Sequence, residues 1–190
     1  MNRRQYLLTS TAALAGLSGC LGETEYTVTD VSIAHTTAPL SLEVVASDAG
    51  ITVDSPGVLD VRLHNTSETS IDVRSTGTWP FGLLALDPPT ERDSGTVLLL
   101  SDHYADSEHV EVGENSVWTD NETISRSVDA GASVTERYEI HGDRIYRAGD
   151  HTLRGYFEPV FLSYRSGETE EWVPFRSEVV VTITKRSLLP

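Results

Sequence analysis

Residues 59–74 read LDVRLHNTSETSIDVR, and this stretch decides the fold class. Apolar and polar residues alternate through 59–64, and the same alternation returns in 71–74. A period of two places the apolar side chains on one face of an extended strand, whereas a helix would repeat them every 3.6 residues. Asn65 begins the polar segment between the two runs, and asparagine favours turns. The stretch therefore predicts two half-buried strands joined by a turn.

Segments of the same kind recur along the chain. Besides the two above, they are residues 26–33, 40–44, 81–86, 96–100, 123–128, 134–140, 152–157, 160–164 and 179–183. Turn-forming pairs such as Pro56-Gly57 and Pro88-Pro89 separate them. About ten short strands with one apolar face each predict two antiparallel sheets packed face to face, in an immunoglobulin-like β-sandwich. A closed barrel is the alternative.

Composition agrees with an all-β chain and excludes several classes of protein. The chain has 190 residues, of which 29 are acidic and 14 basic, so its formal net charge is −15. Lys and Gln occur once each, whereas Thr and Val occur 21 and 19 times, and this balance favours strands over helices. The acidic surface excludes nucleic acid as a partner, because that affinity comes from Lys and Arg that neutralise phosphates. The single cysteine excludes an internal disulfide, a zinc ribbon and an iron–sulfur cluster.

The N-terminus has the order of a secretory signal. Residues 1–22 read MNRRQYLLTSTAALAGLSGCLG, with two arginines, an apolar stretch and then small residues. The apolar stretch of about a dozen residues is shorter than the roughly 20 that a membrane-spanning helix needs. Arg3 and Arg4, followed closely by an aromatic and an apolar residue, resemble the twin-arginine export motif. An uncleaved N-terminal anchor is the alternative.

The only cysteine lies where a lipid would be attached. Residues 17–20 read LSGC and resemble a lipobox, in which the chain is cut before the cysteine and its sulfur receives a lipid. We therefore expect a twin-arginine lipoprotein signal peptide over residues 1–19, a short lipidated tether over 20–25, and a single β-sandwich domain over 26–190. The resemblance implies attachment to the membrane through a lipid on Cys20.

The charge of the processed chain indicates an environment of high salt. Removing residues 1–19 takes away two of the 14 basic residues and no acid, which leaves 12 against 29 and a net charge of −17. This balance, together with the lipobox and the twin-arginine motif, resembles the lipoproteins of halophilic archaea. Concentrated salt screens the repulsion between the acids. The resemblance implies export of the folded domain to the outer face of the cytoplasmic membrane. An acidic surface that steers a cationic partner is the alternative.

Part of the strand pattern resembles a second family. The segments Val61–Asn65, Ile71–Val73, Val117-Trp118, Val128–Val134 and Ala148–Leu153 resemble the immunoglobulin-like intracellular proteinase inhibitor family of bacilli. Its members show a strand that ends in Asn, a Trp-containing middle and a glycine turn before each of two late strands. The resemblance covers about half of the mature chain. It implies the fold, and it makes proteinase inhibition an alternative function for which no inhibitory residue can be assigned.

The sequence contains no recognisable catalytic or cofactor motif. The mature chain lacks the Gly-Xaa-Ser-Xaa-Gly elbow of serine hydrolases, the His-Glu-Xaa-Xaa-His pair of zinc proteases and a phosphate-binding glycine loop. A blue copper site needs a cysteine thiolate beside two histidines, and the only thiol is expected to carry a lipid. We expect no cofactor and no catalytic residue.

The densest polar cluster lies in residues 101–118. Its weak candidates for metal ligands are Asp102, His103, Asp106 and His109, because carboxylates can hold Ca²⁺ and imidazoles can hold Zn²⁺. The spacing matches no EF-hand loop, so a solvated acidic loop is the favoured interpretation and no metal is expected.

Two asparagines match the N-glycosylation pattern. Asn65-Thr66-Ser67 and Asn121-Glu122-Thr123 both have the Asn-Xaa-Ser/Thr order. Asn65 also lies where a strand turns, so a structural role competes with modification there. The aromatic residues are expected mostly in the core: Trp79, Phe81, Trp118, Tyr156, Phe157, Phe161, Tyr164, Trp172 and Phe175. An exposed partner surface at Trp79-Pro80-Phe81 is the alternative.

The sequence as a whole predicts a lipid-anchored protein of the cell envelope that is not an enzyme. Its expected role is a binding or accessory module, with an envelope protein as partner. A small hydrolase or metal-dependent enzyme built on the long loops is one alternative, and proteinase inhibition is the other.

Overall fold

The computed structural model describes residues 25–34, 36, 39–90, 95–113, 116–158, 160–167 and 169–186. The expected export residues Arg3 and Arg4 and the expected lipidation residue Cys20 lie outside these ranges. Within the described ranges no helix is long and apolar enough to cross a membrane.

The described residues form fifteen strands and two short 3-10 helices, η1 and η2. In chain order the elements are β1 Tyr26–Ala34, β2 Leu40–Asp48, β3 Gly50–Ile51, β4 Gly57–Asn65, β5 Ile71–Thr76, β6 Leu84–Asp87, β7 Val97–Leu98, η1 Asp102–Tyr104, β8 Val110–Val112, β9 Val117–Thr119, β10 Thr123–Val128, β11 Ser133–Ile140, η2 Gly142–Arg144, β12 Gly149–Gly155, β13 Ser163–Ser166, β14 Val173–Pro174 and β15 Glu178–Lys185. Ten of the strands have four or more residues, in agreement with the number expected from the sequence.

The strand order identifies the two faces of a sandwich. The largest sheet has the order β3-β1-β15-β12-β6-β7, and a separate three-stranded sheet has the order β11-β4-β2. Strands β2, β4 and β11 against β6, β12 and β15 repeat the arrangement of A, B and E against C, F and G in immunoglobulin domains. The predicted immunoglobulin-like antiparallel β-sandwich is confirmed. The barrel alternative is wrong, because the described strands form separate sheets.

The alternation that opened the sequence analysis produces the core. In β4, Leu59, Val61 and Leu63 are fully buried, and in β15 Val179 and Val181 are as well. All five belong to one apolar cluster that fills the space between the sheets. Burying a side chain of this size is worth about 1.5–3 kcal/mol, so the period-two pattern also determines which face each strand turns inward.

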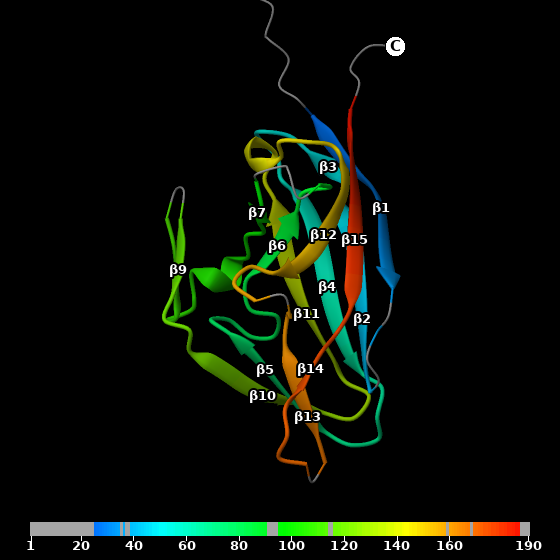
Figure 1. Cartoon of the computed structure of the whole chain (residues 1–190), viewed down its shortest axis with the longest axis vertical. Helices are drawn as coiled ribbons and strands as arrows, with labels where there is room; N and C mark the ends of the chain where they lie inside the picture. Colours follow the sequence, from blue (N-terminus) through cyan, green and yellow to red (C-terminus); the bar gives the residue numbers. More distant parts are fainter. Residues whose placement is uncertain are drawn as a thin grey trace, which may run out of the picture.

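Two groups of strands lie outside the two faces of the sandwich. A four-stranded sheet, β10-β5-β13-β14, lies at one end of the molecule, and the β8–β9 hairpin stands out at the side (Figure 1). At the opposite end β1 begins beside the last residues of β15, since Tyr26 pairs with Lys185 (Figure 1). The expected tether therefore enters at the end of the molecule farthest from the four-stranded sheet.

Several aromatic residues depart from the expected core positions. Trp118 is 58 % exposed on β9 and Phe157 is 49 % exposed, so the expectation that they are buried is wrong. Trp118 belongs to a two-stranded hairpin that pairs with no other strand, and such a hairpin has no second layer to cover its side chains. Phe81 and Phe175, in contrast, are almost fully buried.

Candidate functional site

A cavity of about 460 Å³ lies where the Trp79-Pro80 loop meets η1 and the strands β10 and β11. We call it the Trp79 cavity. Its lining combines apolar and charged side chains, and the residues are Thr78, Trp79, Pro80, His103, Asp106, Ser107, Glu108, His109, Ile124, Arg126, Val134, Thr135 and Glu136. The volume falls in the range of small-molecule and peptide-anchor sites, about 300–1,000 Å³.

The loop of residues 77–82, which carries Trp79, is constrained by two glycines and by an internal hydrogen bond. Gly77 and Gly82 on its two sides have φ values of 82° and 66°, a region that side chains rarely adopt. A Cβ on Gly82 would lie 2.8 Å from the Thr76 carbonyl oxygen, so the loop requires glycine there. The Thr78 hydroxyl donates to the Gly82 carbonyl oxygen at 3.2 Å, and the peptide bond before Pro80 is cis. The sequence thus builds a fixed loop rather than an adaptable one.

The Trp79 ring forms a wall of the cavity and is itself half-buried. Its indole nitrogen donates to the Val73 carbonyl oxygen at 3.3 Å, which ties the ring to β5. The Arg126 guanidinium lies 5.3 Å from the ring centroid, within the distance of a cation–π contact. The exposed partner surface considered for Trp79-Pro80-Phe81 is therefore restricted to Trp79, because Pro80 and Phe81 are buried.

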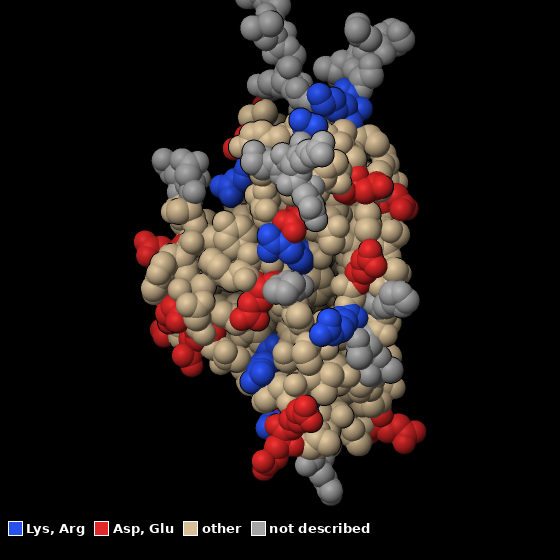
Figure 2. Space-filling view, viewed as in Figure 1, with Lys and Arg blue, Asp and Glu red and all other residues tan. Residues whose placement is uncertain are grey.

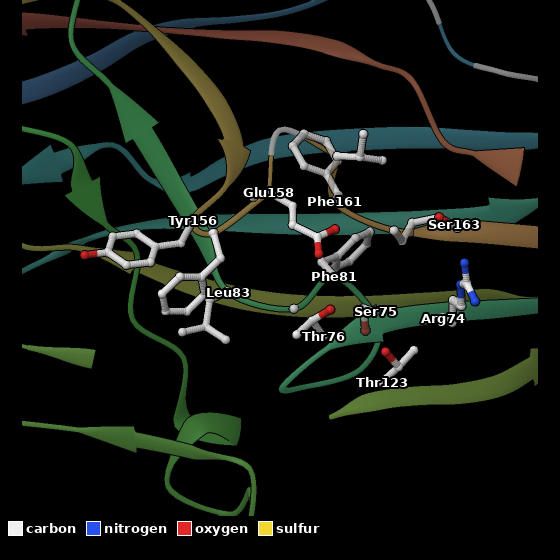
Figure 3. Close-up of a pocket in the computed structure, with 15 residues that line it drawn as sticks. Arg74, Ser75, Thr76, Phe81, Leu83, Thr123, Tyr156, Glu158, Phe161 and Ser163 are labelled. Carbon is white, nitrogen blue, oxygen red and sulfur yellow. The ribbon is translucent and has the colours of Figure 1, made fainter. Parts of the chain in front are cut away.

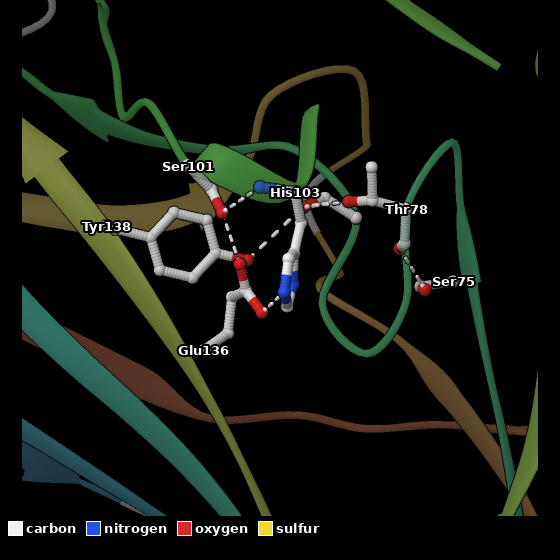
Figure 4. Close-up of polar contacts among 7 residues, drawn as sticks. Ser75, Thr78, Ser101, His103, Glu136 and Tyr138 are labelled. Atoms are coloured by element: carbon white, nitrogen blue, oxygen red, sulfur yellow. Dashed lines mark hydrogen bonds and ion pairs between the residues drawn. The ribbon is translucent and has the colours of Figure 1, made fainter. Parts of the chain in front are cut away.

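Among the residues that the structure describes, Glu136 is the one acidic residue with a buried side chain, being only 5 % exposed. Figure 4 shows its carboxylate between the Ser101 hydroxyl and the His103 ring. His103 Nδ1 lies 2.6 Å from one carboxylate oxygen, and the Ser101 hydroxyl donates to the other. A buried carboxylate needs such partners, since an unpaired charge in the interior costs several kcal/mol.

Ser101 is occupied on both sides of its hydroxyl group. Its oxygen accepts a hydrogen bond from the His103 backbone nitrogen at 3.2 Å, so it caps the first turn of η1, while its proton is directed at Glu136 (Figure 4). A serine nucleophile requires an imidazole that takes its proton and a carboxylate behind the imidazole. Here the carboxylate lies between the serine and the histidine, so the three residues do not have the order of a catalytic triad. They form a hydrogen-bonded cluster that connects β11 to η1.

Two buried tyrosines, Tyr104 on η1 and Tyr138 on β11, lie on the same elements as His103 and Glu136. Burial raises the pKa of the Tyr104 and Tyr138 hydroxyls well above their ordinary value, so both remain protonated. Tyr138 donates to the Gly82 carbonyl oxygen at 3.3 Å, and the Tyr104 oxygen accepts from the Leu84 backbone nitrogen at 3.3 Å. These bonds join β11 to the Trp79 loop and η1 to β6, so they connect elements that surround the cavity.

Three of the four weak metal candidates, His103, Asp106 and His109, line the Trp79 cavity, but they are not arranged as metal ligands. His103 pairs with Glu136, whereas His109 pairs with Asp120 at 2.9 Å. Asp102 and Asp106 are exposed. Among the residues that the structure describes, no group of three or more His, Cys, Asp or Glu side chains is arranged to hold a metal ion.

The His109–Asp120 pair closes the base of the β8–β9 hairpin and makes the hairpin sensitive to pH. The hydrogen bond to Asp120 raises the pKa of His109, and the same bond lowers the pKa of Asp120. The His109 contribution is complete below about pH 6.5, its ordinary pKa, and is lost as the pH rises through the raised value. The Asp120 contribution is lost as the pH falls below the ordinary range of carboxylates. The pair therefore stabilises the hairpin most in mildly acidic solution.

We expect amide hydrogen exchange in Val110–Val112 and Val117–Thr119, corrected for intrinsic rates, to be about two- to fivefold slower at pH 6 than at pH 8. Asp120→Asn should abolish this difference, whereas the control His141→Ala, which removes a separate His–Glu pair, should preserve it. Equal pH dependence in the wild type and in Asp120→Asn would contradict this role.

A second cavity of about 200 Å³ lies between β5 and the segment after β12. Figure 3 shows Leu83 and Tyr156 at one end of it and Arg74, Thr123 and Ser163 at the other. It contains no histidine and no buried carboxylate with a polar partner. We therefore regard the Trp79 cavity as the candidate functional site.

The two candidate glycosylation residues lie in opposite environments. Asn65 is fully buried at the end of β4, and Asn121 is exposed between β9 and β10 with a φ of 62°. The expected export and lipidation residues Arg3, Arg4 and Cys20 lie outside the described part of the chain.

Sequence reasoning missed Ser101, Arg126 and Glu136. A signal for Glu136 was present, because it occupies the same face of β11 as Tyr138 and Ile140, where alternation calls for an apolar residue. A charged residue at a position that alternation places on the buried face requires a hydrogen-bond or ion-pair partner inside the protein. Nothing local in the sequence indicates that the partners are Ser101 and His103, about 35 residues away.

The strand order and the Trp79 cavity define an immunoglobulin-like β-sandwich with a polar, ligand-sized cavity at its side. The chain belongs to the family described as "Domain of unknown function (DUF8130)", which matches residues 1–190. Comparison with curated proteins gave no match, and comparison with solved structures gave none either.

Proposed function

We infer that the chain is a lipid-anchored protein of the cell envelope whose β-sandwich is a non-enzymatic binding module. The twin-arginine pathway exports it, a lipid on Cys20 holds it on the outer face of the cytoplasmic membrane, and the Trp79 cavity receives an envelope partner. The observation that carries the proposal is this cavity, which is lined both by the Trp79 ring and by the buried Glu136 carboxylate.

The polar groups of the cavity favour binding over catalysis. Ser101 and Glu136 satisfy each other, and the Glu136 carboxylate also holds His103. The Ser101 oxygen also accepts a hydrogen bond from the His103 backbone nitrogen, so the serine hydroxyl, the carboxylate and the imidazole are each already bonded to one another. An aromatic side chain held in place, together with polar groups whose hydrogen bonds are already made, is typical of a site that binds a partner.

The rim of the cavity indicates the chemistry of the partner. Asp106, Glu108 and Glu136 line it together with two histidines, and Arg126 is the one basic residue among the lining side chains other than histidine. Acidic side chains also gather over the β8–β9 hairpin on the left of Figure 2, and the sequence from 93 to 125 contains no Lys or Arg. A partner segment with an exposed Lys or Arg and an apolar contact for Trp79 fits such a surface.

The attachment to the membrane rests on the N-terminal sequence. Arg3 and Arg4, the apolar stretch and Cys20 follow the order of an exported lipoprotein, and strand β1 begins at Tyr26, six residues after Cys20. A single lipid chain holds a protein only marginally, so the two-chain lipid that the lipobox resemblance implies is needed for stable anchoring.

Two exposed threonines provide a matched test of the binding surface. Thr135 lines the Trp79 cavity on β11, and Thr152 is an exposed threonine on β12, away from the cavity. Cross-linking on intact membranes in high salt, followed by purification of the anchored protein, should recover the same partner with the wild type and with Thr152→Arg. Thr135→Arg fills the cavity with a bulky cation and should reduce recovery at least about tenfold, the effect of losing roughly 1.4 kcal/mol.

The same preparation separates the two halves of the proposal. Undiminished recovery with Thr135→Arg would contradict the binding surface. The N-terminal peptide tests the anchor independently, because it should begin at lipid-modified Cys20; a peptide that still contains residues 1–19 would contradict the lipoprotein assignment. Equal loss with both arginine variants would indicate a change in the whole domain and would also contradict a role for the cavity.

A further inference from the structure

The two N-glycosylation sequons of the chain differ completely in accessibility. All three residues of Asn121-Glu122-Thr123 are exposed, and the first two lie in the loop between β9 and β10. The Asn121 backbone nitrogen donates to the Thr119 hydroxyl at 3.2 Å and the Glu122 backbone nitrogen donates to Asp120 at 2.9 Å, so the loop has a defined shape. Within the described part of the chain, the Asn121 side-chain amide makes no hydrogen bond.

Asn65 presents the opposite case. Its side chain is fully buried, and its amide nitrogen donates to the carbonyl oxygens of Thr69, Val128 and Asp129 at 2.8, 3.0 and 3.1 Å. Its carbonyl oxygen accepts from the backbone nitrogen and the hydroxyl of Ser67 at 3.0 and 2.7 Å. Both hydrogens of the amide are therefore used inside the protein.

The chemistry of N-glycosylation requires that the asparagine side-chain nitrogen be accessible to the sugar donor. The amide nitrogen of asparagine forms a bond to the anomeric carbon of a sugar on a lipid-linked phosphate donor. The bond between that carbon and the phosphate oxygen breaks, the lipid phosphate leaves with the electron pair, and the amide gives up one proton. An amide nitrogen that is buried and donates three hydrogen bonds cannot reach the donor unless the domain unfolds.

We propose that Asn121 carries an N-linked glycan that is added to the folded domain, and that Asn65 is never modified. This rests on the proposed function in one respect, namely that the domain reaches the outer face of the membrane already folded. The glycan stands on the loop beside the β8–β9 hairpin, three residues after exposed Trp118.

Mass spectrometry of the protein purified from its own membranes tests the proposal. The peptide with Asn121 should be heavier by the mass of a glycan, and the peptide with Asn65 should have its unmodified mass. Thr123→Ala should remove the added mass, while the matched variant Thr123→Ser keeps the hydroxyl of the sequon and should retain it. Thr123 is exposed on an edge strand, so both variants should melt with the wild type.

The outcomes separate this proposal from the function on which it rests. An unmodified Asn121 overturns it, and a glycan on Asn65 overturns the claim that folding precedes modification. The N-terminal peptide of the same digest reports the anchor separately, since it begins either at lipid-modified Cys20 or within residues 1–19. A glycan retained in Thr123→Ala would show that the added mass is not an N-linked glycan and would also overturn the proposal.

Discussion

Asn65→Asp is expected to lower the free energy of unfolding by about 3–5 kcal/mol at neutral pH, one of the largest effects that a single atom exchange could have in this domain. The substitution keeps the shape of the side chain and replaces the amide nitrogen by an oxygen. That oxygen would face the carbonyl oxygens of Thr69, Val128 and Asp129, which in the wild type accept hydrogen bonds from the Asn65 amide nitrogen. The carboxylate would be buried among partners of which none, in the described part of the chain, is a cation, and three carbonyl groups would lose their donor.

Chemical denaturation in concentrated salt measures the effect, and Asn121→Asp provides the matched control. Asn121 is exposed, so its substitution should change the free energy of unfolding by no more than about 0.5 kcal/mol. Acidification should restore part of the stability of Asn65→Asp, because protonation removes the charge and returns one donor. Similar denaturation midpoints for the two variants would show that the Asn65 bonds contribute little.

Transfer from about 1 M salt to about 0.01 M salt is expected to lower the melting temperature by about 10 °C. The Debye length rises from roughly 3 Å to 30 Å over this range, so acids that were screened begin to repel one another. The net charge over residues 20–190 is −17, and repulsion of a few tenths of a kcal/mol between neighbouring acids, summed over such a surface, would cost about 3 kcal/mol. For a domain of this length, 1 kcal/mol corresponds to roughly 2–4 °C.

Calorimetry or circular dichroism over a salt series measures this effect. A variant in which exposed Glu108 and Glu111 are changed to Gln should show a shallower dependence on salt, because both lie in the acidic segment that contains no Lys or Arg. Replacing the salt by an uncharged osmolyte should not restore the melting temperature to the same extent. A melting temperature that is independent of salt would show that the acids are too far apart to interact.

The sequence predicts the strands well because alternation is a local property. The runs 59–64, 71–74 and 123–128 were recognised from a few consecutive residues, and the structure places strands there. The pairing of β4 with β2 and β11, in contrast, joins residues that are far apart in the chain, and only the resemblance to immunoglobulin-like inhibitors gave a hint of it. Trp118 shows the same limit, since no local pattern says that its hairpin has no second layer above it.

The candidate site lies largely beyond what the sequence can predict. Trp79 was recognised as a residue between strands, and His103 was named only as a weak metal ligand. Their relation depends on Glu136, which reaches His103 across more than thirty residues of chain. A cavity is formed by side chains from several elements at once, so the information that defines it is distributed over the whole fold rather than held in a motif.

The pairing of β1 with β15 determines how the domain would respond to mechanical load. If Cys20 is fixed in the bilayer and a partner pulls on the body of the domain, the force enters β1 at Tyr26 and acts along the strand axis. The eight residue pairs between β1 and β15 would then be sheared together instead of opening one after another. A lifetime under force is governed by the rate of unfolding, and shear loading of a whole ladder slows that rate. The strand nearest the anchor would thus serve as a strong attachment between the membrane and the partner.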